Sequence, residues 1–342
     1  MSKSPASGSS RLFSGLQPTG TLHLGNYIGA LSFWVERQAD YESIFCIADL
    51  HALTNPKAVR PDDLRQHVPE TAALLLACGI DPTRSMVFVQ SRLPEHAELA
   101  WLLNCVTPVG WVQRMTQFKT KAVARAAATI GLLDYPVLQA ADILLYQTDV
   151  VPVGEDQRQH IELTRDIAQR FHALYGQAFT FPEGLVRERG ARIMGLDDPS
   201  VKMSKSLAAS RRGHAIGLTD SPDEIRTAVM RAVTDSGQSL RFDAISPGLE
   251  NLVTIYEVLS GKARAEVERE FAGKGYGVLK RAVADVIIAT TEPIRRRFGE
   301  LMEDTADLDR ILNAGAAEAR PIAAATLARV KAAMGILAAG AG

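Results

Sequence analysis

The stretch Gly15-Leu-Gln-Pro-Thr-Gly-Thr-Leu-His-Leu-Gly-Asn26 joins a predicted strand to a predicted helix. The strand is residues 11–14, which are short, partly apolar and bounded by glycine. The helix is residues 27–39, whose apolar positions follow helical spacing. Three glycines allow a ligand to approach the backbone closely, and the N–H groups at a helix N-terminus favour phosphate. Since His23 lies directly before the helix and could hydrogen-bond a phosphate oxygen, the stretch predicts a nucleotide site.

The chain has 342 residues, 46% hydrophobic and 23% charged, which is ordinary for a globular protein and favours one large or two modest domains. No apolar run is long enough to span a membrane, and the Ser-rich residues 1–10 lack the apolar core of a signal peptide, so we expect a disordered tail. The three cysteines have no metal-ligand spacing and predict buried thiols in a reducing cytoplasm. Because the net charge is only −1, any nucleic-acid contact must come from local basic patches such as residues 211–212 or 295–297.

Strand-length apolar runs alternate with helical patterns in the first part of the chain. This order predicts a Rossmann-like α/β domain with a parallel sheet and right-handed crossovers. Ligands of such sheets bind beyond the carboxyl ends of the strands, where residues 15–26 and 49–51 fall. The further predicted strands are residues 43–48, 85–91, 150–153 and 191–194. The further predicted helices are residues 61–78, with a kink or break at Pro69, and residues 95–106, 111–118, 134–146 and 154–175, the last stopped by Gly176.

From about Ser221 onward, helical patterns follow one another without strands. Residues 221–224 form a capping box with proline at the first helical position. The further helices predicted here are residues 252–259, 263–271, 278–288, 293–302 and 321–337. We therefore expect a tail over residues 1–10, a Rossmann-like domain over 11–213 that includes the loop 202–206, and an all-helical domain with a C-terminal helix over 214–342.

Residues 134–146 predict a strongly apolar and therefore buried helix, with Pro136 at its first position. Helical spacing places four side chains on one face, namely Tyr135, Gln139, Asp142 and Tyr146. A buried carboxylate is costly unless a donor pairs with it. Pairing with an arginine or a backbone N–H would make Asp142 purely structural, and the residues alone leave that alternative open.

A second distinctive stretch is residues 202–206, Lys-Met-Ser-Lys-Ser, which a chain of this length contains by chance with a probability on the order of 10⁻⁴. Together with His23-Leu24-Gly25-Asn26 it resembles the paired signatures of the class I aminoacyl-tRNA synthetases. The second signature is matched without change. The first departs from the family's His-Ile-Gly-His at Asn26, so an uncharged amide replaces the second histidine.

Further stretches make the resemblance narrower, because they are similar to the bacterial tryptophanyl-tRNA synthetases. They are residues 15–20, 115–119, 135–136, 140–146 and 151–157, and the similarity runs from about Leu12 to at least Gly261. It implies that Asp142 accepts the indole N–H of tryptophan, and a carboxylate suits a group that can only donate. Gln139 departs from the methionine that is more frequent in the family at one side of the indole pocket.

The same resemblance implies a two-step reaction, in which tryptophan and Mg·ATP give tryptophanyl-adenylate and pyrophosphate, and the tRNA ribose then displaces AMP. The implied catalytic residues are His23, Lys121, Lys202 and Lys205. The implied ATP-binding residues are Gln17, Pro18, Thr19, Gly25, Asn26, Gly154, Glu155, Asp156, Ile193, Lys202, Met203, Ser204, Lys205 and Ser206. The implied tryptophan-binding residues are Phe13, His51, Tyr135, Gln139, Asp142, Val151 and Gln157.

The resemblance also implies the surroundings in which the protein works. Its partners would be L-tryptophan, ATP and tRNA(Trp), with no membrane partner, and the chain would form a homodimer in the cytoplasm. The helical region would read the anticodon. Mg²⁺ would be held mainly by the ATP phosphates, without a structural metal bound to the protein.

Three alternatives compete with this interpretation. Tyrosyl-tRNA synthetases share the fold and both signatures, but a phenol needs both a donor and an acceptor in its pocket. Another adenylyl-transferring enzyme that activates a small carboxylate would not need the helical region. A catalytically silent relative that only binds tRNA or tryptophan is opposed by the intact His23, Lys202 and Lys205.

Overall fold

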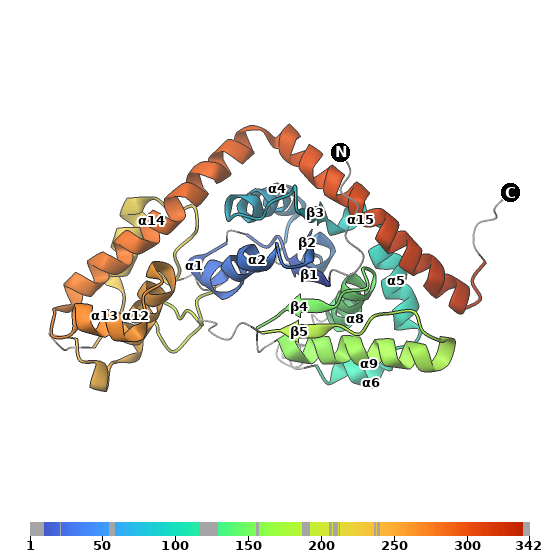
Figure 1. Ribbon diagram of the computed structural model, residues 1–342, viewed down its shortest axis with the longest axis horizontal. Coiled ribbons are helices and arrows are strands. Elements are labelled where there is room, and N and C mark those ends of the chain that lie inside the picture. The colour runs from blue at the N-terminus through green and yellow to red at the C-terminus, as the bar shows by residue number, and fades with distance from the viewer. Residues whose placement is uncertain are drawn as a thin grey trace.

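Five parallel strands form the centre of the protein in a computed structural model (Figure 1). The structure describes residues 10–20, 22–54, 59–115, 129–154, 157–186, 192–204, 207, 211, 213–235, 237 and 240–337. The strands are β1 (Arg11–Leu16), β2 (Glu42–Ile47), β3 (Ser85–Val89), β4 (Val150–Pro152) and β5 (Glu183–Leu185). They lie in the order β3-β2-β1-β4-β5 with parallel pairing throughout, which confirms the predicted Rossmann-like sheet.

The strand order reverses between β1 and β4. β2 and β3 lie on one side of β1, whereas β4 and β5 lie on the other side. In the pairing of β1 with β2, Phe13 is opposite Ile44 and Leu16 is opposite Ile47, so both strands end at the same edge of the sheet. Open α/β sheets bind their ligands at such a reversal, outside the carboxyl ends of the strands.

The predicted strands 11–14, 43–48, 85–91 and 150–153 are confirmed as β1 to β4, with ends shifted by one or two residues. The prediction for residues 191–194 is wrong, because in the described part of this segment Met194 forms only an isolated bridge with Lys202. The fifth strand is instead β5, in which Gly184 pairs with Val151. Its sequence Glu-Gly-Leu carries no apolar run, and its strand conformation comes from backbone pairing at the sheet edge.

Helices cover both faces of this sheet. They are α1 (Leu24–Asn26), the π-helical segment η1 (Tyr27–Leu31), α2 (Ser32–Arg37), α3 (Asp49–Ala52), α4 (Pro61–Ala77), the 3₁₀ turn η2 (Gln90–Arg92), α5 (Glu95–Asn104), α6 (Val109–Gln113), α8 (Ile130–Leu144) and α9 (Arg158–Tyr175). The predicted stop of α9 is confirmed, since Gly176 has a φ of 90°. Pro69 does not split α4.

The helix that carries Asp142 begins earlier than predicted. Pro136 lies inside α8 and is not its first residue, so that prediction is wrong. The helix starts after Thr129, whose Oγ1 accepts a hydrogen bond from the backbone N–H of Leu132 at 3.1 Å. A threonine N-cap therefore determines the start of the helix, and the proline is accommodated in its interior.

The C-terminal part of the chain is helical, as expected. It contains α11 (Pro222–Arg231), the 3₁₀ turn η5 (Phe242–Ala244), α12 (Pro247–Ser260), α13 (Arg264–Phe271), α14 (Tyr276–Glu303) and α15 (Thr305–Ala333). The capping box is confirmed, because the backbone N–H of Ser221 donates to Glu224 at 2.8 Å. The predicted helices 278–288 and 293–302 are one helix, α14, with Pro293 inside it. The last helix begins at Thr305, well before residue 321.

The two longest helices, α14 and α15, form the arms of a V over the molecule (Figure 1). α14 leads away from α12 and α13, whereas α15 returns along the sheet domain. Ala316, Ala319 and Ala323 of α15 are buried in the same core as Phe88 of β3. The last helix therefore completes the sheet domain, although it follows the helical region in sequence.

Two further expectations concern cysteines and membranes. Cys46 and Cys78 are buried as expected, but Cys105 is exposed, so the expectation of a buried thiol is wrong there. Among the helices that the structure describes, none is both long and apolar enough to cross a membrane.

The closest approach of α15 to the sheet gives a testable prediction. A Cβ added at Gly315 would lie 2.1 Å from the backbone oxygen of Val87, so Gly315→Ala should lower the free energy of unfolding by about 1–3 kcal/mol. Gly299→Ala in α14 is the matched control, since its added Cβ would have no heavy atom within 4 Å apart from the neighbouring backbone of its own helix, and alanine favours helix by about 1 kcal/mol. Urea denaturation measures both. Equal stabilities of the two variants would contradict the close contact.

Candidate active site

The carboxyl ends of β1 and β4 bring together several residues that the sequence predicts for ATP. Gln17, Pro18 and Thr19 follow β1 directly, and the backbone N–H of Thr19 donates to the carbonyl of Gln17 at 2.9 Å. Gly154 follows β4 and accepts from the N–H of Gln157, which precedes α9. These segments flank the point at which the strand order reverses. Glu155 and Asp156 lie outside the described residues.

The first signature begins the helical run after β1. His23 is the N-cap of α1, and its backbone N–H donates to Oδ1 of Asn26 at 3.1 Å. Asn26, the departure from the family pattern, therefore closes the first turn as a capping residue does. Gly25 lies against the His23 ring, since an added Cβ would be 3.1 Å from two of its atoms.

The second signature contacts the first, although the two are far apart in sequence. The backbone N–H of Met203 donates to the carbonyl of Ile193 at 3.0 Å, and Lys202 pairs with Met194. A Cβ at Gly25 would lie 3.5 Å from Cβ of Met203, whose side chain is buried in the core. The predicted ATP residues Ile193 and Met203 thus lie next to the first signature, and Ser204 follows Met203 in the chain. Lys205, Ser206 and Lys121 lie outside the described residues.

The helical region supports both signatures through backbone and side-chain contacts. The N–H of Leu24 donates to the carbonyl of Ile216 at 2.8 Å, which attaches the first signature to the segment before α11. Asn251 of α12 donates to the carbonyl of Met194 at 3.0 Å and accepts from its N–H at 2.9 Å. One amide of the helical region therefore fixes the hairpin that carries the second signature.

His214 is a buried residue next to the second signature that the sequence analysis did not identify. Its Nδ1 lies 2.5 Å from Oδ1 of Asp197, and its Nε2 lies 3.4 Å from the carbonyl oxygen of Lys202. Gly195 packs on the ring so closely that an added Cβ would be 2.3 Å from Cε1. Histidine has no sequence pattern that reveals such a role, because its partners come from other segments.

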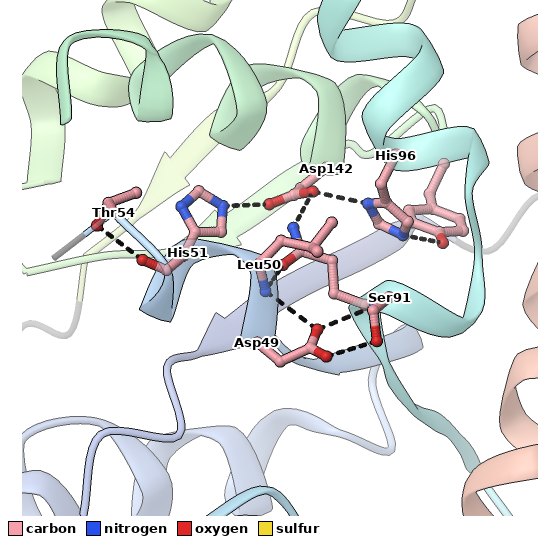
Figure 2. A network of polar contacts seen from close by, with 9 residues as sticks. Asp49, Leu50, His51, Thr54, Ser91, His96 and Asp142 are labelled. Atoms are coloured by element: carbon pink, nitrogen blue, oxygen red, sulfur yellow. Dashed lines mark hydrogen bonds and ion pairs between the residues drawn. The ribbon is translucent and has the colours of Figure 1, made fainter. Parts of the chain in front are cut away.

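Asp142 is 3% exposed and is held by donors from three other elements, as Figure 2 shows for His51 and His96. His51 Nε2 of α3 lies 2.7 Å from Oδ2, and His96 Nδ1 of α5 lies 2.7 Å from Oδ1. Gln90 Nε2, at the end of β3, donates to Oδ1 at 2.6 Å. If Asp142 were purely structural, an arginine or a backbone N–H was the expected partner. Among the described residues its partners are instead two histidines and a glutamine.

These donors determine the charge of Asp142. Burial alone would raise the pKa of this carboxyl group, but the charges and hydrogen bonds of His51 and His96 lower the pKa to about 2. Asp142 is therefore ionised at neutral pH and can only accept hydrogen bonds. Because the pKa is lower in the folded than in the unfolded protein, Asp142 stabilises the fold at any pH above its unfolded-state pKa near 4. This contribution is lost as the pH falls from about 4 to about 2.

The other predicted tryptophan residues lie around this carboxylate. The ring of Phe13 stacks on Tyr146 with 5.6 Å between centroids and 12° between planes, and His96 contacts Tyr146. On the opposite side, the ring of Tyr135 meets His51 edge-on at 6.4 Å. Val151 is buried in the same core cluster, and Gln139 is half-buried on the helix turn before Asp142. The predicted aromatic and polar walls are thus brought together, while Gln90 and His96 were missed.

A buried glutamine at the end of a strand was the one signal that could have identified Gln90, since ligands bind at that edge. Nothing in the sequence around His96 could have identified it, because its role depends on the packing of α5 against α8.

Comparisons with known proteins agree with this geometry. The family model of the class I tRNA synthetases (W and Y) matches residues 6–292. A tryptophan–tRNA ligase of Wolinella succinogenes is 49% identical over 328 residues, which are 96% of this chain and 99% of that protein. One of Gloeobacter violaceus is 50% identical over 96% of each chain. The chain belongs to the tryptophan–tRNA ligase family.

Solved structures of relatives show the same fold. Tryptophanyl-tRNA synthetase from Campylobacter jejuni, complexed with ADP and tryptophan, has a TM-score of 0.82 at 34% identity and covers 95% of this chain and 99% of its own. Tyrosyl-tRNA synthetase from Aeropyrum pernix has a TM-score of 0.66 at 22% identity, which shows the fold alone. The predicted family and ligase activity are therefore confirmed, and the three competing interpretations are not supported.

The contact between Asn251 and Met194 gives a second prediction. Asn251→Ala removes two hydrogen bonds next to Ile193 and should lower the free energy of unfolding by about 1–3 kcal/mol. It should also raise the KM for ATP, because the second signature pairs with the released backbone. Asn313→Ala, which removes surface hydrogen bonds to Arg92 and Asp309, is the control. An unchanged KM for ATP in Asn251→Ala would show that the hairpin is positioned without this amide.

Proposed function

We propose which residues of this site bind tryptophan, which bind ATP and which assist the reaction of a tryptophan–tRNA ligase. The chain activates tryptophan with ATP and transfers it to tRNA, as the family does. The observation that carries the proposal is the ionised Asp142, buried near the carboxyl edge of the sheet where the nucleotide signatures lie. Its acceptor-only character suits an indole N–H, which can only donate.

Tryptophan would bind with its indole between the two aromatic sides of the Asp142 site. Phe13, His51, Gln139 and Val151 would contact the ring, and the indole N–H would donate to Asp142. Tyr135 and Gln157 would contact the ammonium and carboxylate groups. This arrangement would point the substrate carboxylate toward Gly154, since Gln157 and Gly154 share a backbone hydrogen bond.

ATP would bind across the ends of β1 and β4, where glycines permit close backbone approach. The residues proposed to contact it are Gln17, Pro18, Thr19, His23, Gly25, Asn26, Gly154, Glu155, Asp156, Ile193, Met203, Ser204 and Ser206. Lys202 and Lys205 would bind the pyrophosphate group, assisted by Lys121. Mg²⁺ would be held mainly by the ATP phosphates, whose oxygens are the ligands this ion prefers.

The chemistry needs no protein nucleophile. A carboxylate oxygen of tryptophan attacks the α-phosphorus of ATP, the new P–O bond forms, and the bond to the β-phosphate breaks to release pyrophosphate. A ribose hydroxyl of the tRNA then attacks the acyl carbon, loses its proton and displaces AMP. Catalysis in both steps consists of positioning and of stabilising charge on the phosphates, which is what lysines, glycines and His23 can supply.

The region 214–342 would recognise the anticodon, and α14 would connect this recognition to the sheet domain. Arg296 and Arg297 of α14 are exposed, and both share one carboxylate, that of Glu300, as their ion-pair partner. We also propose that the protein works in the cytoplasm. The cysteines Cys46, Cys78 and Cys105 are free thiols, which agrees with a reducing compartment.

We further propose a homodimer that forms through an apolar patch beside the tryptophan pocket. Trp101 of α5 and Ile130 of α8 are 67% and 78% exposed, and Leu53 and Val109 are exposed as well. The segments of Leu53 and Ile130 are adjacent, because Oγ1 of Thr129 donates to the carbonyl of Thr54 at 3.2 Å. Exposed apolar side chains gathered in this way are typical of protein interfaces.

The activity prediction uses exchange of labelled pyrophosphate into ATP with each of the twenty amino acids. Only tryptophan should support rapid exchange. Asp142→Ala should raise the KM for tryptophan by about 10- to 100-fold, as expected for a hydrogen bond to a charged group, and leave the KM for ATP nearly unchanged. Equal effects on both substrates would assign Asp142 a purely structural role.

The dimer prediction uses light scattering after size-exclusion chromatography. The double substitution Trp101→Glu and Ile130→Glu places two charges in the patch and should convert the dimer to a monomer. Met230→Glu is the control, because Met230 is an exposed apolar residue on α11, in another part of the molecule. A dimer that survives the double substitution would place the interface elsewhere.

A further inference from the structure

The two oxygens of Asp142 have different surroundings. Oδ1 is bonded to two side chains, Gln90 at 2.6 Å and His96 at 2.7 Å, whereas among the described residues Oδ2 is bonded to His51 alone, at 2.7 Å. An ionised carboxylate has about four acceptor positions, two on each oxygen. Both positions of Oδ1 are therefore filled by protein donors, and Oδ2 retains one.

The ring of His96 is fixed in orientation by its two neighbours. Because Asp142 can only accept, Nδ1 of His96 carries the proton in their contact. Its other ring nitrogen, Nε2, lies 2.8 Å from the hydroxyl oxygen of Tyr146, and burial raises the pKa of Tyr146, which keeps that hydroxyl protonated. The Tyr146 ring is in turn held by its stack on Phe13. Tyr146 and Phe13 thus orient the His96 ring, which donates to Oδ1 of Asp142.

Gln90 is oriented in the same way from the other side. Its side chain is fully buried, and Oε1 accepts the backbone N–H of Leu50 at 3.2 Å. That bond turns the Nε2 donor toward Asp142. Leu50 lies on α3 next to His51, so the same short helix supplies the donor to Oδ2 and the backbone N–H that orients the Gln90 donor to Oδ1.

We propose that Gln90 and His96 are positioning residues that determine specificity, because they fill Oδ1 and thereby direct the ring N–H of the substrate to Oδ2 beside His51. This inference rests on the proposed role of Asp142 as the indole acceptor. Because both acceptor positions of Oδ1 are filled and the donors prevent rotation of the carboxylate, the site offers the substrate one acceptor position, on Oδ2. A ring without an N–H leaves that acceptor unmatched, so the site discriminates against it.

The discriminating substrate is an analogue of tryptophan in which sulfur replaces the indole N–H, 3-(benzothiophen-3-yl)alanine. Its size and shape are close to those of tryptophan, but it donates no hydrogen bond. The ratio of kcat/KM for tryptophan to kcat/KM for this analogue, measured by pyrophosphate exchange, therefore reports the Asp142 contact. A loss of general stability would lower both values together and leave the ratio unchanged.

The matched pair His96→Asn and His96→Gln tests the proposal. Asparagine places an amide nitrogen near the position of Nδ1 and keeps the donor to Asp142, whereas glutamine places it near Nε2 and loses that donor. His96→Asn should keep the ratio within about threefold of the unmodified enzyme. His96→Gln and Gln90→Met should lower it by about 10-fold or more, the value of a hydrogen bond to a charged group, with the KM for tryptophan rising and kcat little changed.

Two outcomes overturn the proposal. One is an equal ratio in His96→Asn and His96→Gln with an unchanged ratio in Gln90→Met. The other, which does not depend on any variant being folded, is a crystal structure of the unmodified enzyme with tryptophan in which the indole nitrogen lies nearer to Oδ1 than to Oδ2. Asp142→Ala separates this failure from failure of the proposed function, because a ratio that survives Asp142→Ala removes Asp142 from indole recognition altogether.

Discussion

The cost of burying one carboxylate, that of Asp142, constrains how the elements of the sheet domain pack. Asp142 lies on a helix whose other side chains are almost all apolar, and an ion in such surroundings is stable only when donors converge on it. Those donors come from α3, from the end of β3 and from α5. Asp49 fastens two of these elements to each other, because it accepts from the backbone and side chain of Ser91 (Figure 2). The polar network therefore fixes the relative positions of segments that share no local sequence pattern.

A second constraint joins the nucleotide end of the site to the helical region. Leu24 and Met203, from the two signatures, are buried in one core with Ile216 and with residues of α11, α12 and α14. Because Leu24 and Met203 belong to the same core, the two signatures are held together and would move as a unit relative to the sheet. The opposite end of α14 and the start of α15 belong to a different core, which they share with Leu12 and Phe45 of the sheet. α14 thus contributes to both cores and connects the helical region with the sheet domain.

The parts of the fold that could be predicted are those with a local cause. The apolar runs of β1 to β4, the Ser221 capping box and the glycine stop after α9 all act within a few residues, and each lies where its pattern indicates. The predictions that failed depended on distant partners. β5 exists because β4 offers a free edge, and α15 is long because Gly315 and the alanines after it fit against β3 and the neighbouring helices. The start of α8 was predicted wrongly from Pro136, because the N-cap is Thr129, which lies outside the apolar pattern.

The sequence by itself determined the fold class, the family and the presence of one carboxylate, Asp142, within an apolar segment of helix, because short motifs and apolar runs are written in consecutive residues. The tertiary structure alone decided what surrounds that charge. Gln90 and His96 reach Asp142 only after β3, α5 and α8 have packed, and the lowering of its pKa follows from that packing. Hydrogen bonds and electrostatic interactions act over a few ångströms of space, so residues far apart in the chain become partners only in the folded protein.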